Sequence, residues 1–370
     1  MRTVIALVAC LVVGTTAQAA PNVTNASQKG SLLVFPDIRV DTGWNTLIRI
    51  QNDGARDAYM KCYWLDGNKN RVDFTISLTR DQAIWFDAAT GHGTLQVNPF
   101  PIGAANGFTA GNRHPFLAPG FGPYRRGMLT CWAIENASAQ HQVKWNHFSG
   151  TATVYNAQNG AYEFGAFGFF APIGTDLEPI GISGTLNLNG LQYDACPLYL
   201  MGHFTPAPLA PFNRLAVTSC SLNLNQDWIP VFTKLQFDVW NQEEVKFTGA
   251  YECADSWHDT TFQPGTVGQI DGTNPIVPGF VDGIDAAGEN FAFATLGAFA
   301  ARYRVQGIQS AQCDRAKADR STVAAVKTQA VGLLGVQSAL VSGRMVGTTV
   351  PGAGKFNGRV VWDVESCGCE

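Results

Sequence analysis

Charged residues are scarce in this chain. Asp, Glu, Lys and Arg make up 15% of its 370 residues, well below the usual share. The formal net charge is −4 and no basic run occurs, so a nucleic acid is not expected as a partner. Low charge combined with 11% aromatic residues also argues against disorder. No run of about 18 apolar residues is present, so we expect no transmembrane helix in the mature chain.

Common catalytic and metal-binding signatures are absent as well. The chain has no G-x-S-x-G nucleophile elbow, no H-E-x-x-H zinc motif, no phosphate-binding loop and no C-x-x-C pair. Covalent haem is not expected, because C-x-x-C-H is missing. No cofactor is predicted on these grounds, and they favour a protein that is not an enzyme.

The first nineteen residues have the pattern of a cleavable secretory signal. Arg2 is followed by an apolar run over 4–13, and Ala17 and Ala19 are the small residues expected before a cut after Ala19. The run is too short to span a bilayer, which takes about 20 residues. We therefore expect a secreted, periplasmic or cell-surface protein. The alternative is that Cys10 ends a lipobox-like Leu-Val-Ala-Cys stretch and carries a lipid.

Cysteine occurs nine times, and eight cysteines remain after the expected cleavage. An even number in an exported chain predicts disulfides more than metal ligation, although the sequence does not give the pairing. The candidates are Cys62, Cys131, Cys196, Cys220, Cys253, Cys313, Cys367 and Cys369. The last two are separated by one residue, a spacing that also admits a redox or metal site.

Alternation of apolar and polar residues predicts β-strands along most of the chain. In 45–52, for example, Ile48 and Ile50 alternate with Arg49 and Gln51. Turns rich in Gly, Asn and Asp interrupt such stretches at spacings typical of a β-sandwich. We expect an all-β fold of two sandwich-like halves with long Gly/Pro loops.

The expected organisation has five parts. They are a signal peptide (1–19), an N-terminal extension (20–30), a β-sandwich domain (31–175), a connecting segment (176–212) and a second β-rich domain (213–370). One stretch departs from the strand pattern. Over 321–334 apolar residues recur every three or four positions, between Ser321 as a cap and Gly335 as a stop, which predicts one short helix.

The stretch TLIRIQNDGARDAYMKCYWLDGNKNRVDFTISLTRDQAIWFDA carries a resemblance. With its Asn-rich turn and its hairpin closing on Asp-Gly, it is similar to immunoglobulin-like modules of exported bacterial proteins over roughly 31–90. Such modules serve many functions, so the resemblance implies architecture and not activity. A second block, 127–156, adds two further strands. A Cys62–Cys131 bridge is expected to tie the two blocks across the sandwich.

Three residues are candidate metal ligands or proton carriers: His147, His258 and Asp259. His147 lies between aromatic neighbours, a setting equally typical of a half-buried histidine with one hydrogen bond. His258 and Asp259 follow Cys253, and a loop fixed by a disulfide would explain them as well. Asp-Gly pairs in the loop over 263–288 admit a calcium ion, against the simpler interpretation of turn-forming residues.

The nine tryptophans suggest carbohydrate binding, because flat aromatic side chains stack on sugar rings. Tryptophans inside strand patterns are expected in the core. Those near turns or strand ends are the candidates for exposure: Trp44, Trp85, Trp228 and Trp257. Sugar binding would require at least two tryptophans exposed on one surface.

The preferred function is therefore that of an exported, non-enzymatic structural or binding protein at the cell surface or in the periplasm. Its partners would be cell-surface components, a polysaccharide or a second copy of the chain. One alternative is a carbohydrate-binding protein that uses exposed tryptophan. The other is an extracytoplasmic hydrolase or metal-dependent enzyme, with a site built from the long loop 91–125, His147 and residues 254–259.

Overall fold

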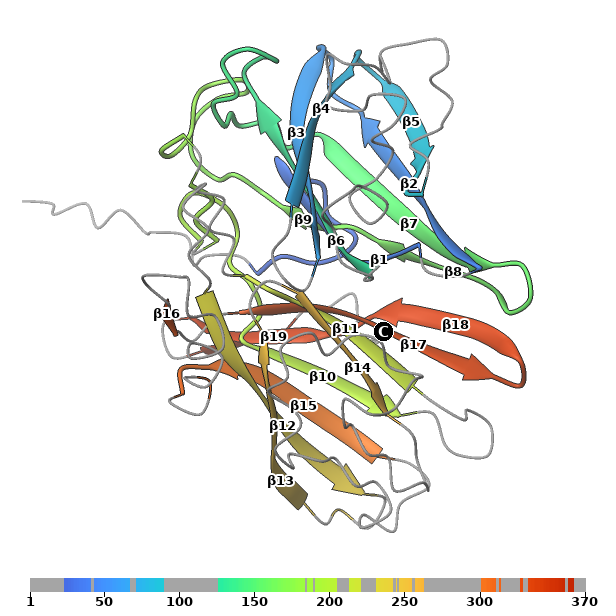
Figure 1. Cartoon of the computed structure of the whole chain (residues 1–370). Coiled ribbons are helices and arrows are strands. Elements are labelled where there is room, and N and C mark those ends of the chain that lie inside the picture. Colours follow the sequence, from blue (N-terminus) through green and yellow to red (C-terminus); the bar gives the residue numbers. More distant parts are fainter. Residues whose placement is uncertain are drawn as a thin grey trace, which may run out of the picture.

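The structure is a computed structural model. It describes residues 23–40, 43–66, 71–89, 126–183, 185–188, 190–204, 213–220, 231–241, 244, 246–254, 257–262, 301–310, 313, 327–328, 332–356 and 359–362. The regular elements within these ranges are β-strands, and no α-helix occurs among them (Figure 1). The predicted all-β fold is thereby confirmed.

The first half of the chain is a sandwich of two antiparallel sheets. Sheet I has the strand order β4 (Arg71–Leu78), β3 (Ala58–Asp66), β6 (Arg126–Ile134), β1 (Leu32–Arg39) and β9 (Phe167–Phe169). Sheet II has the order β5 (Gln82–Asp87), β2 (Trp44–Asn52), β7 (Phe148–Asn156) and β8 (Gly160–Gly165). Their facing side chains, among them Phe35, Ile48 and Trp64, form one apolar core.

The second half repeats this architecture with different strands. Sheet III has the order β13 (Lys246–Ala254), β12 (Val231–Asn241), β15 (Ala301–Ile308), β10 (Tyr199–Phe204), β19 (Gly352–Phe356) and β20 (Arg359–Trp362), with the short β16 (Lys327–Thr328) beside β12. Sheet IV has the order β14 (Trp257–Phe262), β11 (Asn213–Ser219), β17 (Leu333–Val341) and β18 (Arg344–Thr349). Leu215, Phe237 and Tyr303 belong to the core between them.

Sheet IV also packs against the outer side of sheet I, and its strand β18 lies along β8 of sheet II, so that the second sandwich contacts both sheets of the first (Figure 1). Leu32 of β1, Trp257 of β14 and Leu334 of β17 share a second apolar cluster at this interface. As a result both faces of β1 and β6 are covered, and every residue of β6 is buried. This explains why these strands are apolar over several consecutive positions, where a half-exposed strand would alternate.

The segment predicted to connect the halves belongs to both of them. Its strand β10 lies inside sheet III, between β15 and β19. Before it, Leu186, Tyr193 and Cys196 pack into the cluster on the outer side of sheet I. The connection therefore covers apolar surface and is part of the folded body.

The short helix predicted over 321–334 is wrong wherever the structure describes that stretch. Residues 327–328 form β16, and Leu333 and Leu334 begin β17. Leu333 packs into the core of the second sandwich, whereas Leu334 faces sheet I. A strand covered on both faces has consecutive apolar residues instead of alternating ones. Apolar residues then also recur every three or four positions, which is the pattern expected of a helix. Residues 321–326 lie outside the described residues.

Three disulfides are present: Cys62–Cys131, Cys196–Cys220 and Cys253–Cys313. The expected Cys62–Cys131 bridge exists, but the expectation that it spans the sandwich is wrong. It joins directly opposed residues of β3 and β6 within sheet I. Cys367 and Cys369 lie outside the described residues.

Three disulfides fit an oxidising compartment. Among the described residues, no helix has the length and apolar character needed to cross a membrane.

A buried cluster of charges joins the two sandwiches. The Nη1 atom of Arg214 in β11 donates to both carboxylate oxygens of Asp37 in β1, each at 2.8 Å. Its Nε atom donates to Asp259 of β14 at 2.7 Å, and Arg126 of β6 donates to the same carboxylate at 2.9 Å. The hydroxyl of Tyr162 in β8 donates to Asp37 at 2.6 Å. Two arginines and two aspartates therefore neutralise each other inside the interface.

Burial alone would raise the pKa of the Asp259 carboxyl group. The positive charges of Arg214 and Arg126 outweigh this effect and hold that pKa well below its usual range. Burial, together with the neighbouring charge of Asp37, raises the pKa of the Tyr162 hydroxyl, which therefore stays protonated and able to donate. Asp259 is thus ionised at neutral pH, and the Tyr162 hydroxyl remains a donor.

Candidate ligand-binding site

The outer face of sheet II is polar and open to solvent, in contrast to its apolar inner face. Along β2, Ile48 and Ile50 are buried against sheet I, whereas Arg49 and Gln51 point outward and are exposed. The same alternation in β5 turns Trp85 outward, and 40% of its surface is exposed. A period of two is what places these side chains together on one face.

The strand register aligns these outward residues in rows across sheet II. Arg49 of β2 lies opposite Trp85 of β5 on one side and opposite Thr151 of β7 on the other. Thr151 in turn lies opposite Gly165 of β8. The neighbouring row consists of Ala83, Gln51 and Ser149. An aromatic ring, a guanidinium group, an amide and two hydroxyl groups therefore converge on one area.

A turn near the start of the described chain lies over the end of this area. The side-chain oxygen of Asn25 accepts hydrogen bonds from the backbone N–H groups of Ser27 at 3.0 Å and Gln28 at 2.8 Å, which closes the turn. The turn rests on Gly165, where an added Cβ atom would lie 2.1 Å from the carbonyl oxygen of Ala26. Glycine is required here for the close approach of two backbones.

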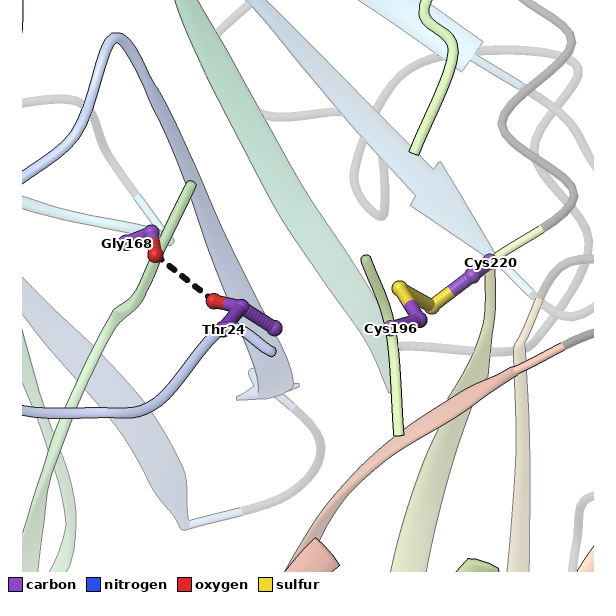
Figure 2. The surroundings of a disulfide bond; sticks show 4 residues. All are labelled: Thr24, Gly168, Cys196 and Cys220. Carbon is purple, nitrogen blue, oxygen red and sulfur yellow. Dashed lines mark hydrogen bonds between the residues drawn. A yellow bond between two sulfur atoms is a disulfide. The ribbon is translucent and has the colours of Figure 1, made fainter. Parts of the chain in front are cut away.

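The same N-terminal segment is anchored to the region where the two sandwiches meet. The hydroxyl of Thr24 donates to the carbonyl oxygen of Gly168 at 2.6 Å, close to the Cys196–Cys220 disulfide (Figure 2). The backbone N–H of Thr24 donates to Ala195, the residue before Cys196, at 2.9 Å. These bonds fix the position of the turn that follows.

Together these elements form a pocket of about 430 Å³. The exposed Trp85 lines one side, and the turn at Ala26–Gln28 lines another. The polar lining residues are Ser27, Gln28, Arg49, Gln51, Ser149 and Thr151. Ligand pockets in proteins commonly measure about 300–1,000 Å³, so this one is large enough for a small molecule or part of a polymer.

A second exposed aromatic side chain lies on the same face. Tyr155 of β7 points to the same side as Thr151 and is 39% exposed. Its hydroxyl accepts a hydrogen bond from the Asn45 amide at 3.0 Å, and that amide also donates to Asp87 at 3.1 Å. From strand rise and strand spacing, the Cα atoms of Trp85 and Tyr155 are about 16 Å apart across the sheet.

The charges on this face are matched. Arg49 donates to the carboxylate of Glu163 in β8 at 3.2 Å, and the hydroxyl of Thr153 donates to the same oxygen at 2.7 Å. Both charged side chains are about half exposed, so the pair contributes little to stability. The guanidinium group has further N–H donors and is half exposed, so it can donate to a ligand while this pair persists.

The four tryptophans predicted to be exposed have different environments. Trp85 is exposed, whereas Trp44 is partly buried against the first core. Trp257 is 5% exposed and donates from Nε1 to the carbonyl oxygen of Pro36 at 2.6 Å, so its predicted exposure is wrong. Trp228 lies outside the described residues. Two exposed tryptophans on one surface are thus not found in the described ranges.

His147, His258 and Asp259 do not form a metal site in the structure. Asp259 is held by two arginines, and its neighbour His258 points to the opposite side of β14, because side chains alternate along a strand. His147 precedes β7, with Nε2 at 3.1 Å from Asp176 and Nδ1 at 3.6 Å from Asp53. No group of three or more potential ligands occurs in the described part of the chain. The loops 91–125 and 263–288 lie outside it.

Sequence reasoning missed most of this site. The alternation over 45–52 had already placed Arg49 and Gln51 on the polar face, and the same rule applied to 148–156 would have added Tyr155. The N-terminal turn has no such signal. Its contact with Gly165 joins distant parts of the chain, which local patterns do not reveal.

Comparison with protein-family models, with curated proteins and with solved structures gave no match for this chain.

Proposed function

We propose that this chain is an exported binding protein that holds its ligand in the pocket on the outer face of sheet II. The secretory pattern over 1–19 and the three disulfides support a location outside the cytoplasm. We also propose that the first sandwich is related to immunoglobulin-like modules, a kinship that concerns its architecture and not its activity.

One observation carries the proposal, namely that the pocket is preformed. Its walls belong to hydrogen-bonded strands and to a turn fixed by Asn25, so binding requires little ordering of the protein. Preorganisation of this kind favours affinity because few side chains lose freedom when the ligand binds. Trp85 can stack on a ligand, and the polar lining residues can form hydrogen bonds with it.

The pocket can be tested by filling it. In the variant Thr151→Trp an indole would occupy the pocket, whereas Thr75→Trp places the same ring on β4 of sheet I, away from the pocket and from the outer face of sheet II. We expect Thr151→Trp to weaken binding at least tenfold and Thr75→Trp to retain it. Ligand-observed NMR with glycans, peptides and small aromatic compounds supplies the measurement.

Two results would contradict the proposal: equal effects of the two variants on every ligand found, or no ligand in any class.

The location is tested separately by N-terminal sequencing of the protein recovered outside the cytoplasm. We expect the chain to begin at Ala20. A chain that still begins at Met1 or that carries a lipid on Cys10 would contradict cleavage after Ala19.

A further inference from the structure

We propose that the ligand is a neutral oligosaccharide that stacks on Trp85 in the pocket and continues along the outer face of sheet II to Tyr155. This inference rests on the proposed function, because it names the class of ligand for the same pocket. It is carried by three observations: the two aromatic rings, the kind of polar groups between them, and the balance of charge.

The aromatic rings supply the apolar part of the recognition. A sugar ring has one or both faces made of C–H groups, and these pack against the negative face of an aromatic ring. Trp85 and Tyr155 are both about two-fifths exposed and lie on the same side of one rigid sheet.

The polar groups beside Trp85 suit the hydroxyl groups at the edge of a sugar ring. Gln51 presents an amide that both donates and accepts, and Ser149 and Thr151 present hydroxyls that do the same. The Gln28 amide also lines the pocket, but it already donates to Gly168 and Asp194 within the protein. Arg49 adds donors alone. Hydroxyl groups of a sugar are also both donors and acceptors, so such a lining can satisfy them when water is displaced.

The charge balance favours a neutral sugar over an acidic one. Arg49 is the one charged residue among the described residues that line the pocket, and Glu163 of β8 neutralises it across β7. At the Tyr155 end the Asn45 amide links the Tyr155 hydroxyl to Asp87, a carboxylate. An acidic sugar would therefore meet no unmatched cation at the pocket.

The separation of the two rings sets the length of the ligand. Because Trp85 and Tyr155 are about 16 Å apart by strand geometry, a single sugar ring cannot touch both. A disaccharide would fill the pocket alone, and a longer oligosaccharide would reach both aromatics. Affinity should therefore rise with chain length until the second ring is engaged.

The test measures binding to the mature protein by calorimetry. The probes are a disaccharide and a longer oligosaccharide from each of cellulose, xylan, mannan and chitin, with oligogalacturonate as the acidic comparison. We expect Trp85→Ala to weaken binding of the short and long neutral probes by about tenfold or more. Phe170→Ala is the matched control, because Phe170 has the same 40% exposure outside this face, and it should leave binding unchanged.

Tyr155 gives an independent signature. Tyr155→Ala should weaken binding of the longer oligosaccharide several-fold and leave binding of the disaccharide unchanged. Tyr155→Phe removes only the hydroxyl that bonds Asn45 and should retain the binding of both. Loss in Tyr155→Phe as well would show that the hydroxyl network and not stacking matters, and would overturn the role of the ring.

The failure of this inference is distinguishable from failure of the proposed function. A non-sugar ligand that Thr151→Trp displaces, with no neutral sugar bound, would overturn the inference and keep the pocket. Preference for oligogalacturonate would also overturn it. If a sugar binds equally well to the natural protein, to Trp85→Ala and to Thr151→Trp, the inference and the proposed function are both overturned. The absence of any ligand would also overturn both.

Discussion

Arg214 is held by carboxylates from different sandwiches, with Asp37 in the first and Asp259 in the second. All three side chains are at most 3% exposed, so their charges are separated from water. Two ion pairs cross the interface, the pair between Arg214 and Asp37 and the pair between Arg126 and Asp259. A cluster of this kind tolerates the loss of one member poorly, because the remaining charges stay buried without a partner.

The variant Arg214→Met should therefore be strongly destabilised. We expect the free energy of unfolding to fall by about 3–5 kcal/mol, because both aspartates lose their main partner. The exposed pair of Arg49 and Glu163 provides the control, and Arg49→Met should cost about 1 kcal/mol or less. Urea denaturation measures both values. Similar losses in the two variants would contradict the importance of the buried cluster.

The same cluster should make the protein sensitive to acid. The pKa of Asp259 is lowered in the folded state, so this group stabilises the fold above its unfolded pKa of about 3.9, and that contribution is lost as the pH falls from there toward the lower folded pKa. Asp259→Asn should be less stable than the natural protein at pH 7, and the difference should shrink on acidification. Unfolding measured between neutral and acidic pH tests this, and a constant difference would contradict it.

At the scale of elements, the N-terminal turn and β8 depend on each other. Gly165→Ala would place its Cβ atom against the carbonyl oxygen of Ala26 and force the turn away from the sheet. We expect a loss of about 1–3 kcal/mol in stability and weaker binding at the pocket. A chain shortened to begin at Gly30 lacks the clashing residue, so there the same substitution should have little effect. Additive effects of truncation and substitution would contradict the contact.

The disulfide between β3 and β6 should also contribute measurably. It closes a loop with a sequence separation of 69 residues. Replacing Cys62 and Cys131 by alanine removes this constraint on the unfolded chain and should cost up to about 4 kcal/mol by loop-closure entropy. Thermal unfolding of the double variant and of the natural protein gives the comparison, and equal stability would show that the bridge adds nothing to the strand pairing.

Sequence patterns predicted these elements unequally. Strands with one face in water alternate clearly, and β2, β5 and β7 could be predicted from that alone. Strands covered on both faces lose the signal, and β17 was therefore misread as part of a helix. Trp257 was expected on the surface for a related reason, since nothing local shows that Pro36 and sheet I lie over it. Contacts between distant segments decide such positions.

At the scale of the whole molecule, the two sandwiches should unfold together. They share the charge cluster and the apolar cluster that contains Leu32, Trp257 and Leu334, so neither half keeps its surface covered alone. We expect one calorimetric transition whose calorimetric and van't Hoff enthalpies agree. Two separated transitions would show that the interface is weak.

The stacking of sheet IV on sheet I has a consequence for the order in which the protein can be made. The strands of the first sandwich are complete at Phe169, but the outer side of β1 is covered by β11, β14 and β17, which come much later in the chain. A newly synthesised first half therefore carries an uncovered apolar face until the last strands arrive. We expect a chain in this state to be prone to aggregation until its second half has been made.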